Sequence, residues 1–83
     1  MTALELIMEE YPDQEFLYPT GFESAVIGLD INSFCLIMDA TKILDLLVER
    51  DGMNEEEAIE YFEYNISCAY VGEKTPIYAN VYI

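Results

Sequence analysis

The sequence predicts a single α+β domain, and three observations support this prediction. Apolar residues recur at helical spacing in three segments, and three other segments have the composition and alternation of strands. The segments follow the order αββααβ, which favours a three-stranded, mainly antiparallel sheet with the paired helices on one face. Two stable cores would not fit in 83 residues, so we expect residues 1–83 to form one domain.

The first predicted helix covers residues 2–11. Its apolar side chains lie at helical spacing, and Thr2 with Glu5 matches a capping box. Pro12 ends this helix, because proline cannot continue the helical hydrogen bonding. We expect residues 12–21, which contain two prolines, to form a loop over the surface.

Two β-rich segments, residues 22–31 and 33–39, are predicted to form a hairpin. Polar residues around Asp30 and Asn32 suit a tight connection between them. The second segment is apolar on both faces, which indicates a central strand or a strand that is covered on both sides. The first is expected to be mostly one-sided, with Val26 on the minor face. Its main face is expected to carry Ala25, Ile27, Leu29 and Ile31.

Two further helices and a final strand are predicted in the second half. Asp39 or Thr41 can cap a helix that runs to about Arg50 with Ile43, Leu44, Leu47 and Val48 as its buried side. Asn54 starts the next helix, in which Glu57 completes a capping box. The expected buried side of that helix is Ala58, Ile59, Phe62, Ile66 and Ala69.

The last strand is predicted at residues 77–83, where apolar residues alternate with polar and tyrosine residues. The sheet face away from the paired helices is then expected to carry Val26, Tyr78, Tyr82 and part of the run 34–38. Either the first helix or a partner covers that face, because a large exposed apolar patch is unusual on a monomer.

The charge balance is the most unusual property of the sequence. Seventeen acidic residues stand against three basic ones, which gives a formal net charge of −14. Such a field repels nucleic acid and anionic membranes and attracts cationic partners, so we expect a basic protein as the partner, and neither direct nucleic-acid binding nor membrane binding. The simpler interpretation is that the acidic surface only keeps the protein in solution.

The cysteines and the absence of a long apolar segment indicate a location. Cys35 and Cys68 lie in apolar runs and are typical of buried free thiols in a reducing compartment. The sequence has neither a secretion signal nor an apolar run of about 20 residues, the length that crosses a bilayer. We therefore expect the protein in the cytoplasm, specifically the cytoplasm of a host cell.

No motif for catalysis or metal binding is present. The chain has no histidine, which removes the commonest general base and metal ligand. Acid pairs such as Glu60 with Glu63 are expected on an exposed helix side, where nothing excludes water, and the region 51–57 lacks the ligand spacing of a calcium loop. The prediction is a protein that is not an enzyme, with no catalytic residue, no metal site and no cofactor.

Carboxylates on the helix after Asn54 form the candidate binding site. Acids at three- and four-residue spacing lie on one side of a helix, with neighbouring Cβ atoms about 6 Å apart. Such a row can imitate the charged backbone of nucleic acid and so occupy the basic channel of a host nuclease. The simpler alternative for each carboxylate is that it lies on a solvated helix surface and contacts no partner. The predicted partner-binding residues are Glu55, Glu56, Glu60, Glu63, Tyr64 and Glu73.

A second function class stays open, namely a non-catalytic structural or regulatory interaction module, which includes a homodimer. Tyrosines would make its contacts, because tyrosine brings a large contact area at a small entropic cost. The candidates are Tyr61, Tyr64, Tyr70, Tyr78 and Tyr82, although Tyr70 and Tyr82 are themselves expected to be core residues.

Two stretches of the sequence form a distinctive pattern. One is Gly21-Phe22-Glu23-Ser24-Ala25-Val26-Ile27-Gly28, and the other runs from Asp51-Gly52-Met53-Asn54-Glu55-Glu56-Glu57-Ala58 through Glu60-Tyr61-Phe62-Glu63-Tyr64-Asn65 to Ala69-Tyr70-Val71-Gly72-Glu73 and Thr75-Pro76. Together they resemble a family of small proteins of tailed phages, prophages and plasmids.

The resemblance implies an origin in a mobile element but no reaction, cofactor or site residue. Cys68 departs from it, since the family usually has glycine there, and we expect this cysteine to tighten helix packing. Charge and resemblance together predict a phage-type accessory protein that binds and blocks a basic host protein, as an anti-CRISPR or anti-restriction inhibitor does.

Overall fold

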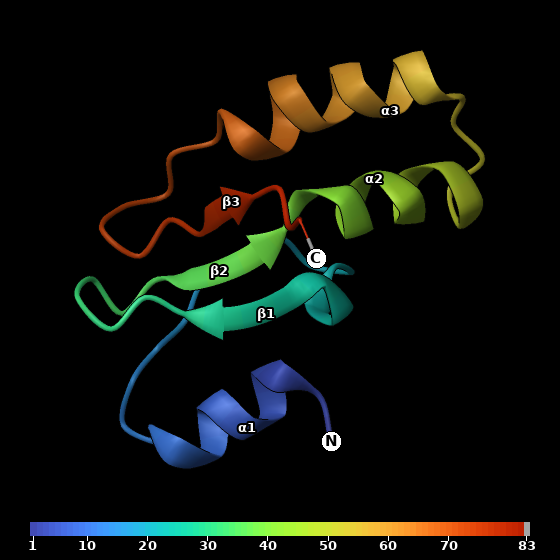
Figure 1. Ribbon diagram of the computed structural model, residues 1–83. Coiled ribbons are helices and arrows are strands. Elements are labelled where there is room, and N and C mark those ends of the chain that lie inside the picture. The colour runs from blue at the N-terminus through green and yellow to red at the C-terminus, as the bar shows by residue number, and fades with distance from the viewer. Residues whose placement is uncertain (83) are drawn as a thin grey trace.

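The computed structural model describes residues 1–82 and confirms the predicted α+β class (Figure 1). Ile83, the end of the last predicted strand, lies outside the described residues. The elements in chain order are helix α1 (Ala3–Glu10), 3-10 turn η1 (Glu23–Ala25), strands β1 (Val26–Leu29) and β2 (Leu36–Asp39), helices α2 (Ala40–Glu49) and α3 (Glu55–Tyr61), π-helix η2 (Phe62–Ser67) and strand β3 (Ile77–Ala79).

The three strands form one mixed sheet in the order β1-β2-β3. Strand β2 pairs antiparallel with β1 and parallel with β3, so the apolar β2 is central, as predicted. A parallel pair needs a long crossover, which α2, α3 and η2 provide. In Figure 1, α2 and α3 lie together on one side of the strands, while α1 lies at the opposite side of the molecule and contacts β1.

Each helix begins at a cap that the sequence encodes. The hydroxyl oxygen of Thr2 accepts a hydrogen bond from the Glu5 N–H, and the Glu5 carboxylate accepts one from Thr2 in return. Helix α2 is capped by Asp39 and not by Thr41, because the Asp39 carboxylate accepts hydrogen bonds from the N–H groups of Thr41 and Lys42. These bonds satisfy N–H groups that otherwise lack a partner inside the helix.

The core is centred on β2 and α2. Its largest fully buried side chains are Leu36 and Met38 from the strand and Ile43 and Leu47 from the helix. The four-residue period of α2 directs both of its residues onto the sheet, while Leu44 and Val48 on the adjacent side are partly buried.

The first strand is shorter than predicted, and a bulge changes which of its side chains share a face, although Ala25 is buried and Leu29 packs against the core as predicted. Residues 23–25 form η1, and the strand register shifts between Val26 and Gly28. A turn followed by a bulge interrupts the two-residue alternation on which the prediction depended. As a result Val26 is buried, whereas Ile27 is 45% exposed.

The tyrosine of β3 faces the paired helices, so its predicted placement on the opposite face is wrong. The strand register aligns Val26, Met38 and Tyr78 on one face. There the Tyr78 ring meets the Phe62 ring edge-on at 5.5 Å, and burial raises the pKa of the Tyr78 hydroxyl. A tyrosine ring removes more apolar area from water than an isoleucine side chain does, which favours this orientation and leaves Ile77 on the outer face.

The hairpin end is held by polar contacts within the turn. The Asp30 carboxylate accepts hydrogen bonds from the Asn32 N–H and the Ser33 hydroxyl, and these bonds lower the pKa of Asp30. Phe34 adopts a left-handed conformation with φ of 58°, and its ring meets the Tyr11 ring edge-on at 5.3 Å. The turn is thereby attached to the end of α1.

Candidate functional site

Helix α3 begins with acidic residues for a local reason. The Asn54 side-chain oxygen accepts a hydrogen bond from the Glu57 N–H at 2.8 Å, and the Glu57 carboxylate accepts one from the Asn54 N–H at 3.2 Å. Glu55 and Glu56 share this first turn, where the partial positive charge of the helix start favours carboxylates. The cap therefore engages Glu57 and leaves its two neighbours exposed.

The helix changes its period at Phe62, where the π-helix η2 begins. In η2 the hydrogen bonds span one residue more than in an α-helix. Glu60 and Tyr64 line one shallow hollow together with Glu57 and Tyr61, and these four residues have the i, i+3, i+4 and i+7 spacing of one ordinary helix face. Glu63 is exposed on η2 but does not line that hollow.

The six predicted site residues do not form one continuous patch. Glu60 and Tyr64 lie together at the hollow, and Glu56 and Glu63 are exposed beside it on the same helix. Glu55 faces α2 instead. Glu73 lies beyond the helix in the following turn, where its backbone carbonyl accepts a hydrogen bond from the Cys35 thiol at 3.1 Å.

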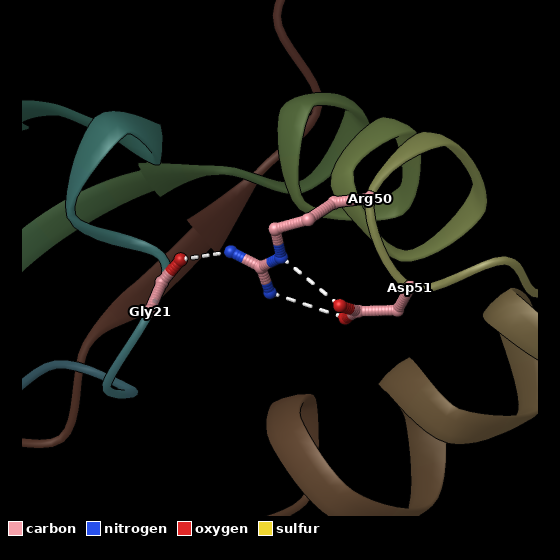
Figure 2. A network of polar contacts seen from close by, with 3 residues as sticks. All are labelled: Gly21, Arg50 and Asp51. Carbon is pink, nitrogen blue, oxygen red and sulfur yellow. Dashed lines mark hydrogen bonds and ion pairs between the residues drawn. The ribbon is translucent and has the colours of Figure 1, made fainter.

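Arg50 and Lys74, two of the three basic residues, are engaged away from the glutamates of α3. Figure 2 shows the Arg50 guanidinium donating two hydrogen bonds to the Asp51 carboxylate, at 3.0 and 3.1 Å, and one to the Gly21 carbonyl. The guanidinium also lies 4.8 Å from the centre of the Phe22 ring. The hydrogen bonds from Arg50 lower the pKa of Asp51, and the same contact raises the pKa of Arg50.

The Lys74 side chain also makes its contacts away from the glutamates of α3. Its ammonium group donates a hydrogen bond to the Phe34 carbonyl at 3.3 Å and lies 5.4 Å from the centre of the Phe34 ring. Within residues 1–82 the one ion pair joins Arg50 and Asp51. In this part of the chain, no ion pair neutralises the carboxylates of α3 and η2.

Several apolar and tyrosine side chains near the acids are exposed. Tyr64, Tyr70 and Tyr82 are 79%, 78% and 88% exposed, so the prediction that Tyr70 and Tyr82 belong to the core is wrong. Tyr70 follows the end of η2, and Tyr82 follows the end of β3. Ile59 and Ala69 were also predicted to be buried, and both are exposed.

The two cysteines have different environments. Cys35 is buried, as expected, and its thiol donates to the Glu73 carbonyl. Cys68 is exposed, which contradicts the prediction of a buried thiol that tightens helix packing. It directly follows the last residue of η2, where the chain leaves the helix.

A metal site in the described residues would require a group of side chains that could coordinate a metal ion. Among residues 1–82, no group of three or more His, Cys, Asp or Glu side chains could hold a metal ion. In the same range, no helix is long and apolar enough to cross a membrane.

A groove between α2 and α3 was missed by the sequence reasoning. It is lined by residues at i, i+3, i+4 and i+7 of α2 and at i, i+3 and i+4 of α3. The same periodicity was visible in the sequence, but it was interpreted as complete burial of the apolar members. The lining residues are Thr41, Leu44, Asp45 and Val48 of α2 and Glu55, Ala58 and Ile59 of α3.

Fold and surface together define a small acidic α+β protein whose α3 region combines exposed carboxylates with exposed tyrosines. The chain matches no protein-family model, no curated protein and no solved structure. The resemblance to small proteins of tailed phages, prophages and plasmids therefore stays a prediction.

Proposed function

We propose that this is a phage-type accessory protein that binds a basic, nucleic-acid-binding host protein and blocks it. An anti-CRISPR or anti-restriction inhibitor acts in this way. The observation that supports the proposal is the group formed by Glu56, Glu60 and Glu63, which are exposed and make no ion pair within residues 1–82. The formal charge of −14 extends the negative field around this group.

The proposed mechanism is competition for a basic channel. Carboxylates of α3 and η2 take the places of phosphates against Lys and Arg side chains of the partner. Tyr64 lies beside Glu60 and adds an aromatic face on which a cationic side chain can stack. Binding then excludes nucleic acid, and the inhibitor needs no catalytic group of its own.

Affinity capture tests this proposal with two matched charge reversals. One variant carries Glu56→Lys, Glu60→Lys and Glu63→Lys, and the other carries Glu9→Lys, Glu10→Lys and Asp13→Lys at exposed positions in and after α1. Both variants raise the net charge by the same amount, so a general effect of charge would weaken partner binding in both.

The wild type and the α1 variant are expected to retain a basic nucleic-acid-binding protein from host lysate at low salt and to release it as salt rises. The retained protein should lose its nucleic-acid binding in a gel-shift assay. Undiminished retention by the α3 variant, with circular dichroism that shows an intact fold, would contradict the proposal.

The exposed tyrosines favour a second candidate, a non-catalytic interaction module that forms a homodimer. Tyr70 and Tyr82 would supply its contact area. Salt separates the two candidates because two copies of a chain with charge −14 repel each other. Screening should strengthen self-association in sedimentation experiments, whereas it should weaken binding to a basic partner.

A further inference from the structure

The groove between α2 and α3 has an apolar floor and two acidic rims. Leu44 and Val48 of α2 and Ile59 of α3 form most of the floor, and the groove encloses about 270 Å³. Leu44 and Val48 are half-buried, while Ile59 is 46% exposed although it lies in the first turns of a helix that packs against α2. The packing of the two helices thus leaves apolar area open to water.

The rims carry charge of one sign. Asp45 lies on the α2 side and Glu55 on the α3 side, both exposed, and neither forms an ion pair within residues 1–82. No basic residue lines the groove. An occupant therefore has to combine an apolar surface with flanking positive charge, and a second copy of this acidic chain or a nucleic acid does not meet that requirement.

The dimensions favour a helical occupant. The α2 stripe extends from Thr41 to Val48, which at 1.5 Å per residue is about 10 Å, or two helical turns. Leu44 and Val48 on α2, with Ala58 and Ile59 on α3, present an apolar strip between two helices that accepts the apolar side of a third helix. Lysine or arginine residues beside that apolar side would then reach Asp45 and Glu55.

We propose that the α2–α3 groove binds a short amphipathic helix of the basic partner, with apolar residues at helical spacing and Lys or Arg residues beside them. This inference rests on the proposed function for the existence of a basic partner. It goes further by naming the kind of segment that is recognised and a surface separate from the group Glu56, Glu60 and Glu63. The negative charge of the protein attracts the basic partner, and the groove determines which helical segment of that partner is bound.

The probe for this site is a fluorescent 18-residue Leu/Lys peptide with leucine at i, i+3, i+4 and i+7. A second peptide of identical composition has its leucines distributed around the helix. Fluorescence anisotropy of the wild-type protein at about 150 mM salt, where the Debye length is about 8 Å, is expected to show tighter binding of the amphipathic peptide. Equal affinity for both peptides would overturn the proposal, since charge alone does not distinguish them.

Matched variants locate the binding. Asp45→Asn with Glu55→Gln removes both rim charges, and Glu49→Gln with Glu10→Gln removes two charges from exposed helix positions outside both the groove and the group Glu56, Glu60 and Glu63. The rim pair is expected to weaken binding of the amphipathic peptide about tenfold more than the outside pair, a difference of about 1.4 kcal/mol. Equal losses of affinity in the two paired variants would show that the peptide binds through the overall negative charge of the protein and not through the groove.

The floor is tested with Ile59→Asn, for which Ile31→Asn in the exposed hairpin turn is the control. The first substitution should weaken binding of the amphipathic peptide, and the second should leave it unchanged. If Ile59→Asn also leaves it unchanged while circular dichroism shows α3 intact, the groove is not the site. That result would leave the lysate experiment with Glu56, Glu60 and Glu63 unaffected, so the two proposals fail separately.

Discussion

The first 52 residues and residues 53–82 use their apolar side chains in opposite ways. The first region supplies the largest fully buried side chains, Leu36, Met38, Ile43 and Leu47. In the described part of the second region, buried side chains are confined to Ala58, Ile66 and Pro76, while the exposed tyrosines and Ile59 lie there.

This contrast indicates a division of roles. Burial of apolar area is the main source of folding free energy, so most of the stability comes from the first region. The second region contributes one helix side and a short strand to that core and keeps its remaining apolar and acidic side chains accessible. A surface that is both apolar and charged is suited to recognition. The predictions below test the contrast, from the largest expected effect to the smallest.

Truncation of a side chain in each region should produce very different losses of stability. Leu47→Ala removes a fully buried side chain and is expected to cost about 2–5 kcal/mol of the free energy of unfolding. Ile59→Ala removes a half-exposed one and should cost under about 1 kcal/mol. Urea denaturation followed by circular dichroism measures both. Similar losses would show that α3 belongs to the core as fully as α2 does.

The thiols provide one chemical probe in each region. Cys68 is exposed, whereas Cys35 is buried and bonded to the Glu73 carbonyl. With Ellman's reagent under native conditions, Cys68 should react at least about tenfold faster, because Cys35 has to wait for local opening. The variants Cys68→Ser and Cys35→Ala identify the two phases. A single fast phase for both thiols would mean that the hairpin opens as readily as the end of η2.

Loss of the α3 cap should weaken the second region selectively. Asn54→Ala removes the acceptor for the Glu57 N–H and is expected to cost about 1 kcal/mol. Amide exchange should accelerate most within residues 55–61, with less change in β2 and α2. Asn80→Ala is a control at an exposed position outside the helices. Uniform acceleration throughout the chain would show that the two regions unfold only together.

The smallest expected effect concerns pH and the contact between Arg50 and Asp51. Because the folded state lowers the pKa of Asp51, its contribution to stability is present above the usual value of about 3.9 and is lost as pH falls through the lowered pKa. Asp51→Asn should therefore lower Tm slightly at pH 7, and the difference from wild type should disappear in strong acid.

Asp13→Asn removes the same charge at an exposed position and serves as the control for this pH experiment. If the Tm values of wild type and Asp51→Asn differ by the same amount from pH 7 down to pH 2, the assignment of the contact is contradicted.

The local features of the fold could be predicted from the sequence. Thr2, Asp39 and Asn54 determine where helices begin through hydrogen bonds to residues two or three positions further on, so a short window contains the whole cause. The central position of β2 followed from its apolar residues on both faces.

Features that depend on distant residues could not be predicted in this way. The bulge after Val26, the inward orientation of Tyr78 and the π-helix after Tyr61 all depend on how separate elements pack together. The candidate site was affected similarly. The acids of α3 and η2 are exposed, but Glu63 does not line the hollow that Glu60 and Tyr64 share, and Glu55 lines the groove against α2 instead.

The parallel pairing of β3 with β2 has a consequence for how the chain reaches its native state. Ile37 lies beside Ile77, so this ladder closes a long crossover that contains α2, α3 and η2. Contacts between residues so far apart in sequence form slowly, whereas the β1–β2 hairpin closes over a short loop. We therefore expect the hairpin and α2 to assemble early in folding and β3 to dock last.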